Sequence, residues 1–135
     1  MFTGCNKRID STTFRMRMEK NNFNITNTIS QYDKELVESA LIAINKSSNY
    51  QIEFLDFKSD DACKNSFIIN RDVFKKNKKD KDKETSVSKN DYSKYTLTTS
   101  DTFYLVSRFE DSLVYLKVDG SFKADAEKII KELGF

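Results

Sequence analysis

Three short segments near the end of the chain, residues 92–98, 102–109 and 113–118, constrain its fold most. Each is rich in aromatic and β-branched residues, and each is separated from the next by a short polar turn, Thr99-Ser100-Asp101 or Glu110-Asp111-Ser112. Connections this short join antiparallel strands, because a parallel crossover needs about a dozen residues. The three segments therefore predict an antiparallel meander.

The first half of the chain predicts further strands. Residues 50–57 alternate in polarity, with Ile52 and Phe54 on the same side. Residues 36–45 are ambiguous, because their apolar side chains fit both a helical stripe and the first arm of a hairpin that turns at 46–49. We favour the strand over 36–45, and the helix remains the alternative.

Helices are predicted at three places. Phe14 and Met18 have helical spacing, although a strand over the same residues competes with that interpretation. Ser59 is a good helix cap, and the acidic residues that follow it favour the positive end of a helix dipole. The last helix closes at Gly134, and its apolar stripe consists of Ala126, Ile129, Ile130 and Leu133.

The order of these elements suggests an internal repeat. Residues 57–64 end a strand and open a helix, and residues 122–128 do the same about 65 residues later. A hairpin precedes each, which indicates two strand–strand–helix units. The alternative is that no repeat exists. Acidic residues are common at the start of any helix that follows a strand, because they are favoured by the helix dipole each time. The predicted fold class is α+β, an antiparallel sheet with helices packed on one face.

A chain of 135 residues fits one domain. Residues 1–10 are expected to form a flexible N-terminal tether and residues 11–135 a single α+β domain. Apolar residues almost vanish from 75–90, which predicts a mobile polar loop. Its lysines are interleaved with acidic residues and lack neighbouring aromatics, and the net charge is only +2, so no nucleic-acid partner is expected.

The residue types present argue against catalysis. There is no His, which removes the commonest general base and the commonest metal ligand. Cys63 lies on the apolar stripe of its helix, so we expect it to be buried rather than nucleophilic. The carboxylate pairs Asp60-Asp61 and Glu110-Asp111 are explained by a helix start and a turn. We expect no enzymatic activity, no cofactor and no metal site; a hydrolase that uses paired carboxylates is the alternative.

Tyrosines in the meander are the candidate binding residues. If several of them face solvent, they would form an amphipathic surface suited to a protein or glycan partner. Alternatively, Tyr serves there only as a good strand former. The candidates are Tyr92, Tyr95, Tyr104 and Tyr115.

The opening Met1-Phe2-Thr3-Gly4-Cys5 bears on location. A hydrophobic residue, two small residues and Cys resemble the end of a bacterial lipoprotein signal, in which Cys5 would carry the lipid; Phe2 stands where Leu is usual. No basic or apolar segment precedes these residues, so the resemblance requires a reading frame that extends upstream. The alternative is a chance Gly-Cys pair at a frayed end.

Three features together resemble the small uncharacterised lipoproteins of low-GC Gram-positive bacteria. They are Phe2-Thr3-Gly4-Cys5, a composition low in Gly and rich in Lys and Asn, and an end that runs from Tyr92-Ser93-Lys94-Tyr95 through strands to a helix closing Leu133-Gly134-Phe135. The resemblance implies a non-enzymatic, extracytoplasmic binding or interaction domain. It would be lipid-anchored at the cell membrane through Cys5 and would meet a protein or glycan of the cell envelope. The alternative is a cytoplasmic accessory or immunity-type protein that binds a protein partner.

Overall fold

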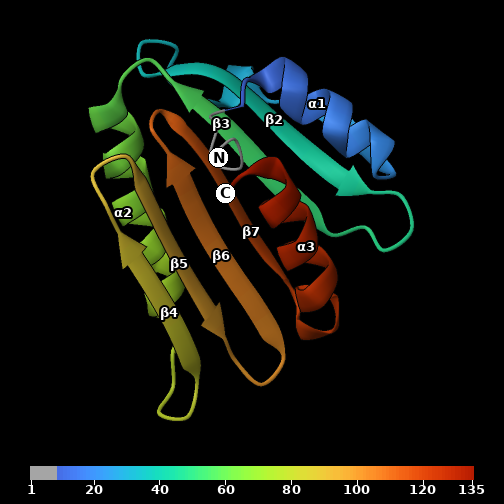
Figure 1. The fold of residues 1–135 in the computed structure, drawn as a ribbon, viewed down its shortest axis with the longest axis vertical. Coiled ribbons are helices and arrows are strands. Elements are labelled where there is room, and N and C mark those ends of the chain that lie inside the picture. Colours follow the sequence, from blue (N-terminus) through green and yellow to red (C-terminus); the bar gives the residue numbers. More distant parts are fainter. Residues whose placement is uncertain (1–8) are drawn as a thin grey trace, which may run out of the picture.

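The meander predicted near the end of the chain is present as β5 (Tyr92–Thr98), β6 (Thr102–Phe109) and β7 (Ser112–Asp119). The computed structural model describes residues 9–135, and Figure 1 shows how their strands and helices are arranged. Glu110 adopts a left-handed backbone conformation, with φ of 55°, at the tight reversal between β6 and β7. The predicted antiparallel arrangement is confirmed.

Within residues 9–135 the sheet has seven strands in the order β1-β2-β3-β7-β6-β5-β4, and neighbouring strands are antiparallel. The other strands are β1 (Phe23–Asn27), β2 (Val37–Asn45), β3 (Gln51–Phe57) and β4 (Lys83–Ser88). β2 settles the ambiguity of residues 36–45 in favour of the strand. It buries side chains on both of its faces, so its apolar run lacks the alternation that identifies a half-exposed strand.

Three α-helices of the described part of the chain pack on this sheet: α1 (Ser11–Lys20), α2 (Asp60–Lys75) and α3 (Lys123–Leu133). Short 3₁₀ turns, η2 (Ile29–Gln31) and η3 (Gly120–Phe122), precede β2 and α3. As predicted, Ser59 caps α2, its hydroxyl accepting from the Ala62 N–H at 3.1 Å. Gly134 closes α3 in the left-handed conformation. The fold class, α+β with an antiparallel sheet, is confirmed.

The expectation that the helices pack on one face of the sheet is wrong. α1 and α3 share an apolar cluster with Phe103 and Leu105 of β6, whereas α2 belongs to a second cluster with Tyr104 and Val106 of the same strand. Figure 1 shows α2 behind the sheet and the other two helices in front of it. Consecutive strand residues point to opposite faces, so an unbroken apolar run such as residues 103–106 of β6 needs cover on both sides.

The strand–strand–helix order does recur, first as β2-β3-α2 and again as β6-β7-α3. β3 and β7 are neighbours in the sheet, so the two hairpins lie side by side. Their helices nevertheless cover opposite faces. The repeat is therefore one of element order, and its two units are not equivalent in space.

The loop expected over residues 75–90 is interrupted by a strand. Residues 83–88 form β4, an edge strand whose residues are all exposed and which pairs with β5 in an unbroken register. Backbone hydrogen bonds hold such a strand without burying either face, so its sequence carries no apolar pattern. Only residues 76–82 and 89–91 are left as connections.

The tether expected over residues 1–10 is also shortened. Residues 1–8, Cys5 among them, lie outside the described residues. Ile9 is buried in the cluster under α1 and α3, and its carbonyl accepts from Ser112 Oγ at 3.2 Å. The Asp10 carboxylate caps α1 by accepting from the Thr13 N–H at 2.8 Å. The expectation of a flexible tether is therefore wrong for Ile9 and Asp10.

Candidate functional site

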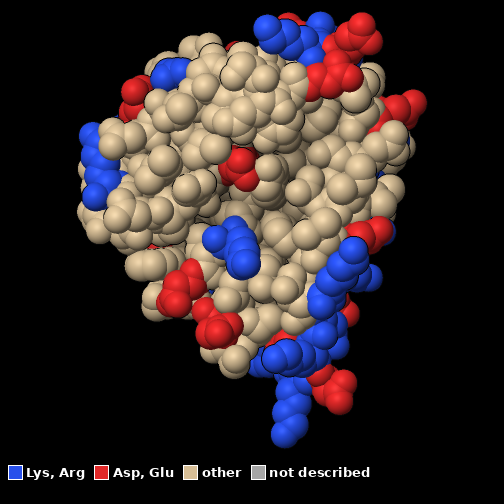
Figure 2. Space-filling model, turned by 180° about the vertical axis from the view of Figure 1, so that it is seen from behind, with Lys and Arg blue, Asp and Glu red and all other residues tan. Residues whose placement is uncertain are grey.

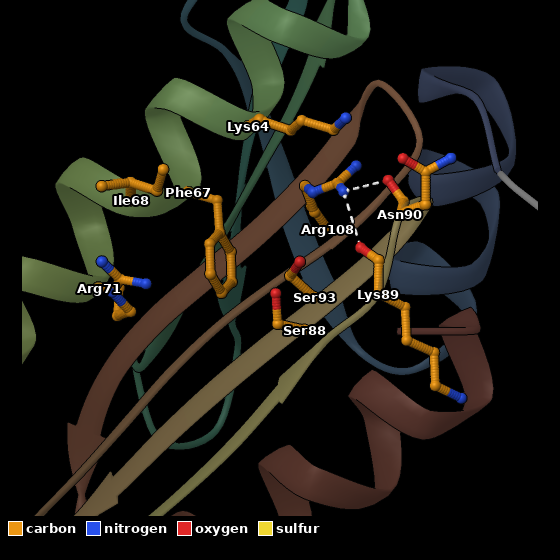
Figure 3. A pocket seen from close by; sticks show the side chains of 9 residues that line it. All are labelled: Lys64, Phe67, Ile68, Arg71, Ser88, Lys89, Asn90, Ser93 and Arg108. Carbon is orange, nitrogen blue, oxygen red and sulfur yellow. Dashed lines mark hydrogen bonds between the residues drawn. The ribbon is translucent and has the colours of Figure 1, made fainter.

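A pocket of about 460 Å³ lies between α2 and the ends of β4, β5 and β6 (Figure 3). Of the described residues that line it, four are positively charged and none is negatively charged. We call it the basic pocket, and its lining consists of Lys64, Phe67, Ile68, Arg71, Ser88, Lys89, Asn90, Ser93 and Arg108.

One wall of the basic pocket is a single side of α2. Lys64, Ile68 and Arg71 follow one another at spacings of four and three residues, which places them on one side of a helix. Phe67 turns towards the sheet and is 6% exposed. The helical spacing of residues therefore places the basic side of α2 next to its buried apolar stripe.

The opposite side of the pocket is hollow because its strand residues are small. Ser88 of β4 pairs with Ser93 of β5, and Ser93 pairs with Arg108 of β6. Two residues further along β5, Tyr95 occupies the same face and is completely buried. Two neighbouring serines thus leave a space that a tyrosine fills farther along the strand.

Arg108 forms hydrogen bonds to two turns beside the pocket. It is 2% exposed, and its guanidinium donates to the carbonyls of Asn90 at 2.7 Å, Glu110 at 3.1 Å and Lys89 at 3.4 Å. Figure 3 shows the bonds to Lys89 and Asn90. These contacts join the β4–β5 turn to the β6–β7 turn. Because carbonyls carry no net charge, they satisfy donors of the guanidinium without neutralising it.

The other three cations of the basic pocket differ in how their side chains lie. In Figure 3 the Lys64 side chain extends from α2 towards Arg108, whereas Lys89 points away from the other lining residues. Arg71 makes an ion pair of 3.0 Å with Asp72 on the surface of α2. A partly exposed pair of this kind contributes at most about 1 kcal/mol, so Arg71 can exchange its partner for a ligand at small cost.

The tyrosines expected to form one binding surface do not form one. Tyr95 and Tyr104 are 0% and 5% exposed in the cluster beneath α2. Tyr92 pairs with Phe109 and lies on the other face of the sheet from Tyr95. The centres of the Tyr92 and Phe109 rings are 6.5 Å apart. Burial raises the pKa of Tyr92 and Tyr95 above the usual value for a phenol. The prediction of a tyrosine surface is corrected, because three of the four residues lie on the face that α2 covers and two of those three are buried.

Tyr115 is the only one of the four that is half-buried on the α2 face. Its hydroxyl lies 3.4 Å from that of Tyr32, and burial is the main cause that raises its pKa. A hollow of about 310 Å³ beside it is lined by Glu53 and Lys117, so it carries charges of both signs. This second hollow lacks the single sign of charge that distinguishes the basic pocket.

Cys63 is buried, as its position on the helical stripe predicts. It is 0% exposed, and burial raises the pKa of its thiol to about 12. A thiol in this state carries almost no thiolate near neutral pH and is a poor nucleophile. Asp60 and Asp61 lie in the first turn of α2, the position that explains them as helix-start charges.

No group of three or more Cys, Asp and Glu side chains within residues 9–135 is placed to hold a metal ion. No helix of the described part is long and apolar enough to cross a bilayer.

Sequence reasoning missed the basic pocket, although one signal for it was present. Val106-Ser107-Arg108-Phe109 lies in a strand whose alternate residues Tyr104 and Val106 are apolar, so Arg108 continues their face. An Arg at an inward-facing position needs several acceptors nearby and marks a buried polar contact. The neighbours that supply those acceptors, the turns at 89–90 and 110, come together only through sheet pairing.

Comparison with known proteins adds no identification. No protein-family model matches the chain, and searches of curated proteins and of solved structures gave no match.

Proposed function

We propose that this protein is a non-enzymatic binding domain that receives an anionic ligand in the basic pocket. One observation carries the proposal: within residues 9–135, four cationic side chains and no acidic one line a hollow of about 460 Å³. Arg in particular matches the geometry of carboxylate and phosphate groups. A partly enclosed site also strengthens such contacts relative to an exposed surface.

The groups whose pKa is shifted support a role other than catalysis. Burial raises the pKa of Cys63, Tyr95 and Tyr115, which keeps each of them protonated and unreactive near neutral pH. Catalytic nucleophiles and bases are usually shifted in the direction that activates them. Together with the absence of His from the chain, this favours binding over acid–base chemistry.

A protein partner fits the surface around the basic pocket better than a nucleic acid does. In Figure 2 basic side chains gather along one margin and at the tip of the α2 face, but acidic side chains lie among them. Strong phosphate-backbone binding requires clustered positive charge that is not compensated. Tyr95 and Tyr104, which could stack on bases, are buried.

Titration with simple anions tests this function. We expect inorganic phosphate to shift the backbone amide signals of residues 64–71 and 88–93 saturably in two-dimensional NMR. The double variant K64Q/R71Q should weaken that binding about tenfold, since each exposed charge contact contributes up to about 1 kcal/mol. The matched control K20Q/K128Q removes two exposed lysines outside the pocket lining and should bind phosphate as the parent does. Shifts that are equal in both double variants would show that the pocket is not the site.

We further propose that the domain is held at the outer face of a bacterial membrane by a lipid on Cys5. The proposal rests on Phe2-Thr3-Gly4-Cys5, which lies outside the described residues. Expression from the full genomic reading frame in a Gram-positive host, followed by intact mass measurement, tests it. A diacylglyceryl group on an N-terminal Cys5 is the expected result. An unmodified chain that begins at Met1 would favour the cytoplasmic accessory or immunity-type protein instead.

A further inference from the structure

We infer that the basic pocket is one end of a longer groove, and that the ligand is an acidic, extended segment of a partner protein that adds to β4 as an eighth strand. This inference rests on the proposed function, because it specifies which anion the basic pocket receives. It combines the open edge of the sheet with the charge of α2.

β4 offers an open edge for pairing. It is the last strand in the sheet order and pairs with β5 alone within residues 9–135. Edge strands are usually protected by charges, proline or a bulge. Lys83 and Glu84 stand at one end of β4, but residues 85–88 are uncharged and the register is continuous. This stretch is therefore a template on which a second chain can form backbone hydrogen bonds.

The register shows which backbone groups point outward. In an antiparallel pair, residues that exchange both hydrogen bonds alternate with residues whose N–H and C=O point away. The Lys89 N–H donates to the Tyr92 carbonyl at 2.7 Å, which fixes the alternation. Ser88, Ser86 and Glu84 then occupy the outward positions. An added strand would bond to these three residues.

The same residues direct their side chains to the α2 face. Ser88 pairs with Ser93, which lines the basic pocket, and Ser86 pairs with Tyr95, which belongs to the cluster beneath α2. Figure 3 shows Ser88 and Ser93 facing α2 across the pocket. Every second side chain of an added strand would therefore lie on this face, next to the basic side of α2.

Charge complementarity selects an acidic occupant. Lys64, Arg71 and Arg108 line the end of the groove at Ser88, and Lys75 lies farther along α2, its Nζ 5.8 Å from the centre of the Tyr95 ring. Alternate strand residues are about 6.7 Å apart. One acidic side chain opposite Ser88 would meet the pocket, and a second, two residues away, would approach Lys75.

The groove also limits where the acidic residues can lie. Glu84 occupies the third outward position of β4. Like charges directly opposite each other in a sheet are destabilising. The structure thus favours a segment with two acidic residues at alternate positions and an uncharged or basic residue at the next alternate position.

A short peptide with blocked ends tests the inference. The probe has seven residues, Glu at the third and fifth positions and Thr at the others, and its blocked termini leave the two side chains as its only carboxylates. Binding is followed by NMR titration at low ionic strength. We expect saturable binding that weakens about tenfold when both Glu are replaced by Gln. Equal binding of the Glu and Gln peptides would overturn the inference.

Two neighbouring residues of β4 give a matched pair of variants. Ser88→Glu places a carboxylate on the α2 face and should weaken peptide binding about tenfold. Val87→Glu makes the same change one residue away, where the side chain points to the other face of the sheet, and should leave binding unchanged. The reverse order of effects would contradict the assigned face.

Strand addition is tested separately from charge. Ser86→Pro removes an outward N–H without breaking a bond to β5, a position at which an edge strand tolerates proline. Peptide binding should fall while phosphate binding persists. Peptide affinity that survives Ser86→Pro would overturn the added strand. In the unsubstituted protein, phosphate binding without peptide binding would sink the inference but keep the proposed function, and failure to bind either would sink both. Tighter binding of a twelve-residue oligothymidine than of the peptide would also count against a protein partner.

Discussion

Replacing Ile130 by Asp is expected to abolish cooperative folding of this domain at 37 °C. Ile130 is 0% exposed and belongs to the apolar cluster that α1 and α3 form with the sheet. An Asp there is a charge without a partner in an apolar environment. The expected loss is about 5 kcal/mol or more, comparable with the whole stability of a domain of this size. Far-UV circular dichroism during thermal unfolding measures the effect.

Two controls separate burial of charge from other changes at this helix. Ile130→Val removes one methylene and should cost about 1 kcal/mol. Lys128→Asp introduces the same carboxylate at an exposed position of α3 and should leave the melting temperature within a few degrees of the parent. A melting curve of Ile130→Asp that superimposes on that of Lys128→Asp would contradict the packing of α3 on the sheet.

Replacing Arg108 by Met is the second large effect. The guanidinium donates to three carbonyls in two separate turns, and Met fills a similar volume without any donor. Hydrogen bonds to a charged group contribute about 1.5–3 kcal/mol each, and buried acceptors left without a donor add a further cost. We expect the free energy of unfolding in urea to fall by about 3 kcal/mol. Phosphate binding should fall as well, because the turns that bound the basic pocket lose their connection.

Arg108→Lys and Lys117→Met are the controls for this prediction. Lys keeps the charge but offers a single nitrogen in place of a planar fork, so it should restore only part of the stability. Lys117 is an exposed cation on the neighbouring strand β7, and its replacement should change stability by less than about 1 kcal/mol. If Arg108→Met were as mild as Lys117→Met, the three carbonyl contacts would contribute little to the fold.

Local signals predicted those parts of the fold that depend on neighbours in the chain. The short turns between residues 92 and 118 predicted an antiparallel meander. Ser59 and the acidic residues that follow it predicted the start of α2. β4 was not predicted, because its residues are all exposed and its backbone hydrogen bonds to β5 hold it in place. Such bonds do not require any pattern of apolar side chains. The prediction that the helices pack on one face was wrong because periodicity shows only that a helix has an apolar stripe. It does not show against which face of a sheet that stripe packs.

The sequence by itself determined an α+β chain without histidine, with an antiparallel meander, a capped α2 and a buried Cys63. Only the tertiary structure decided that Tyr95 and Tyr104 lie under α2 and that Arg108 meets the basic side of that helix. The physical reason is the range of the forces involved. Capping and periodicity act within a few residues, whereas the pocket depends on sheet pairing between residues far apart in the chain, together with the choice of face for each helix.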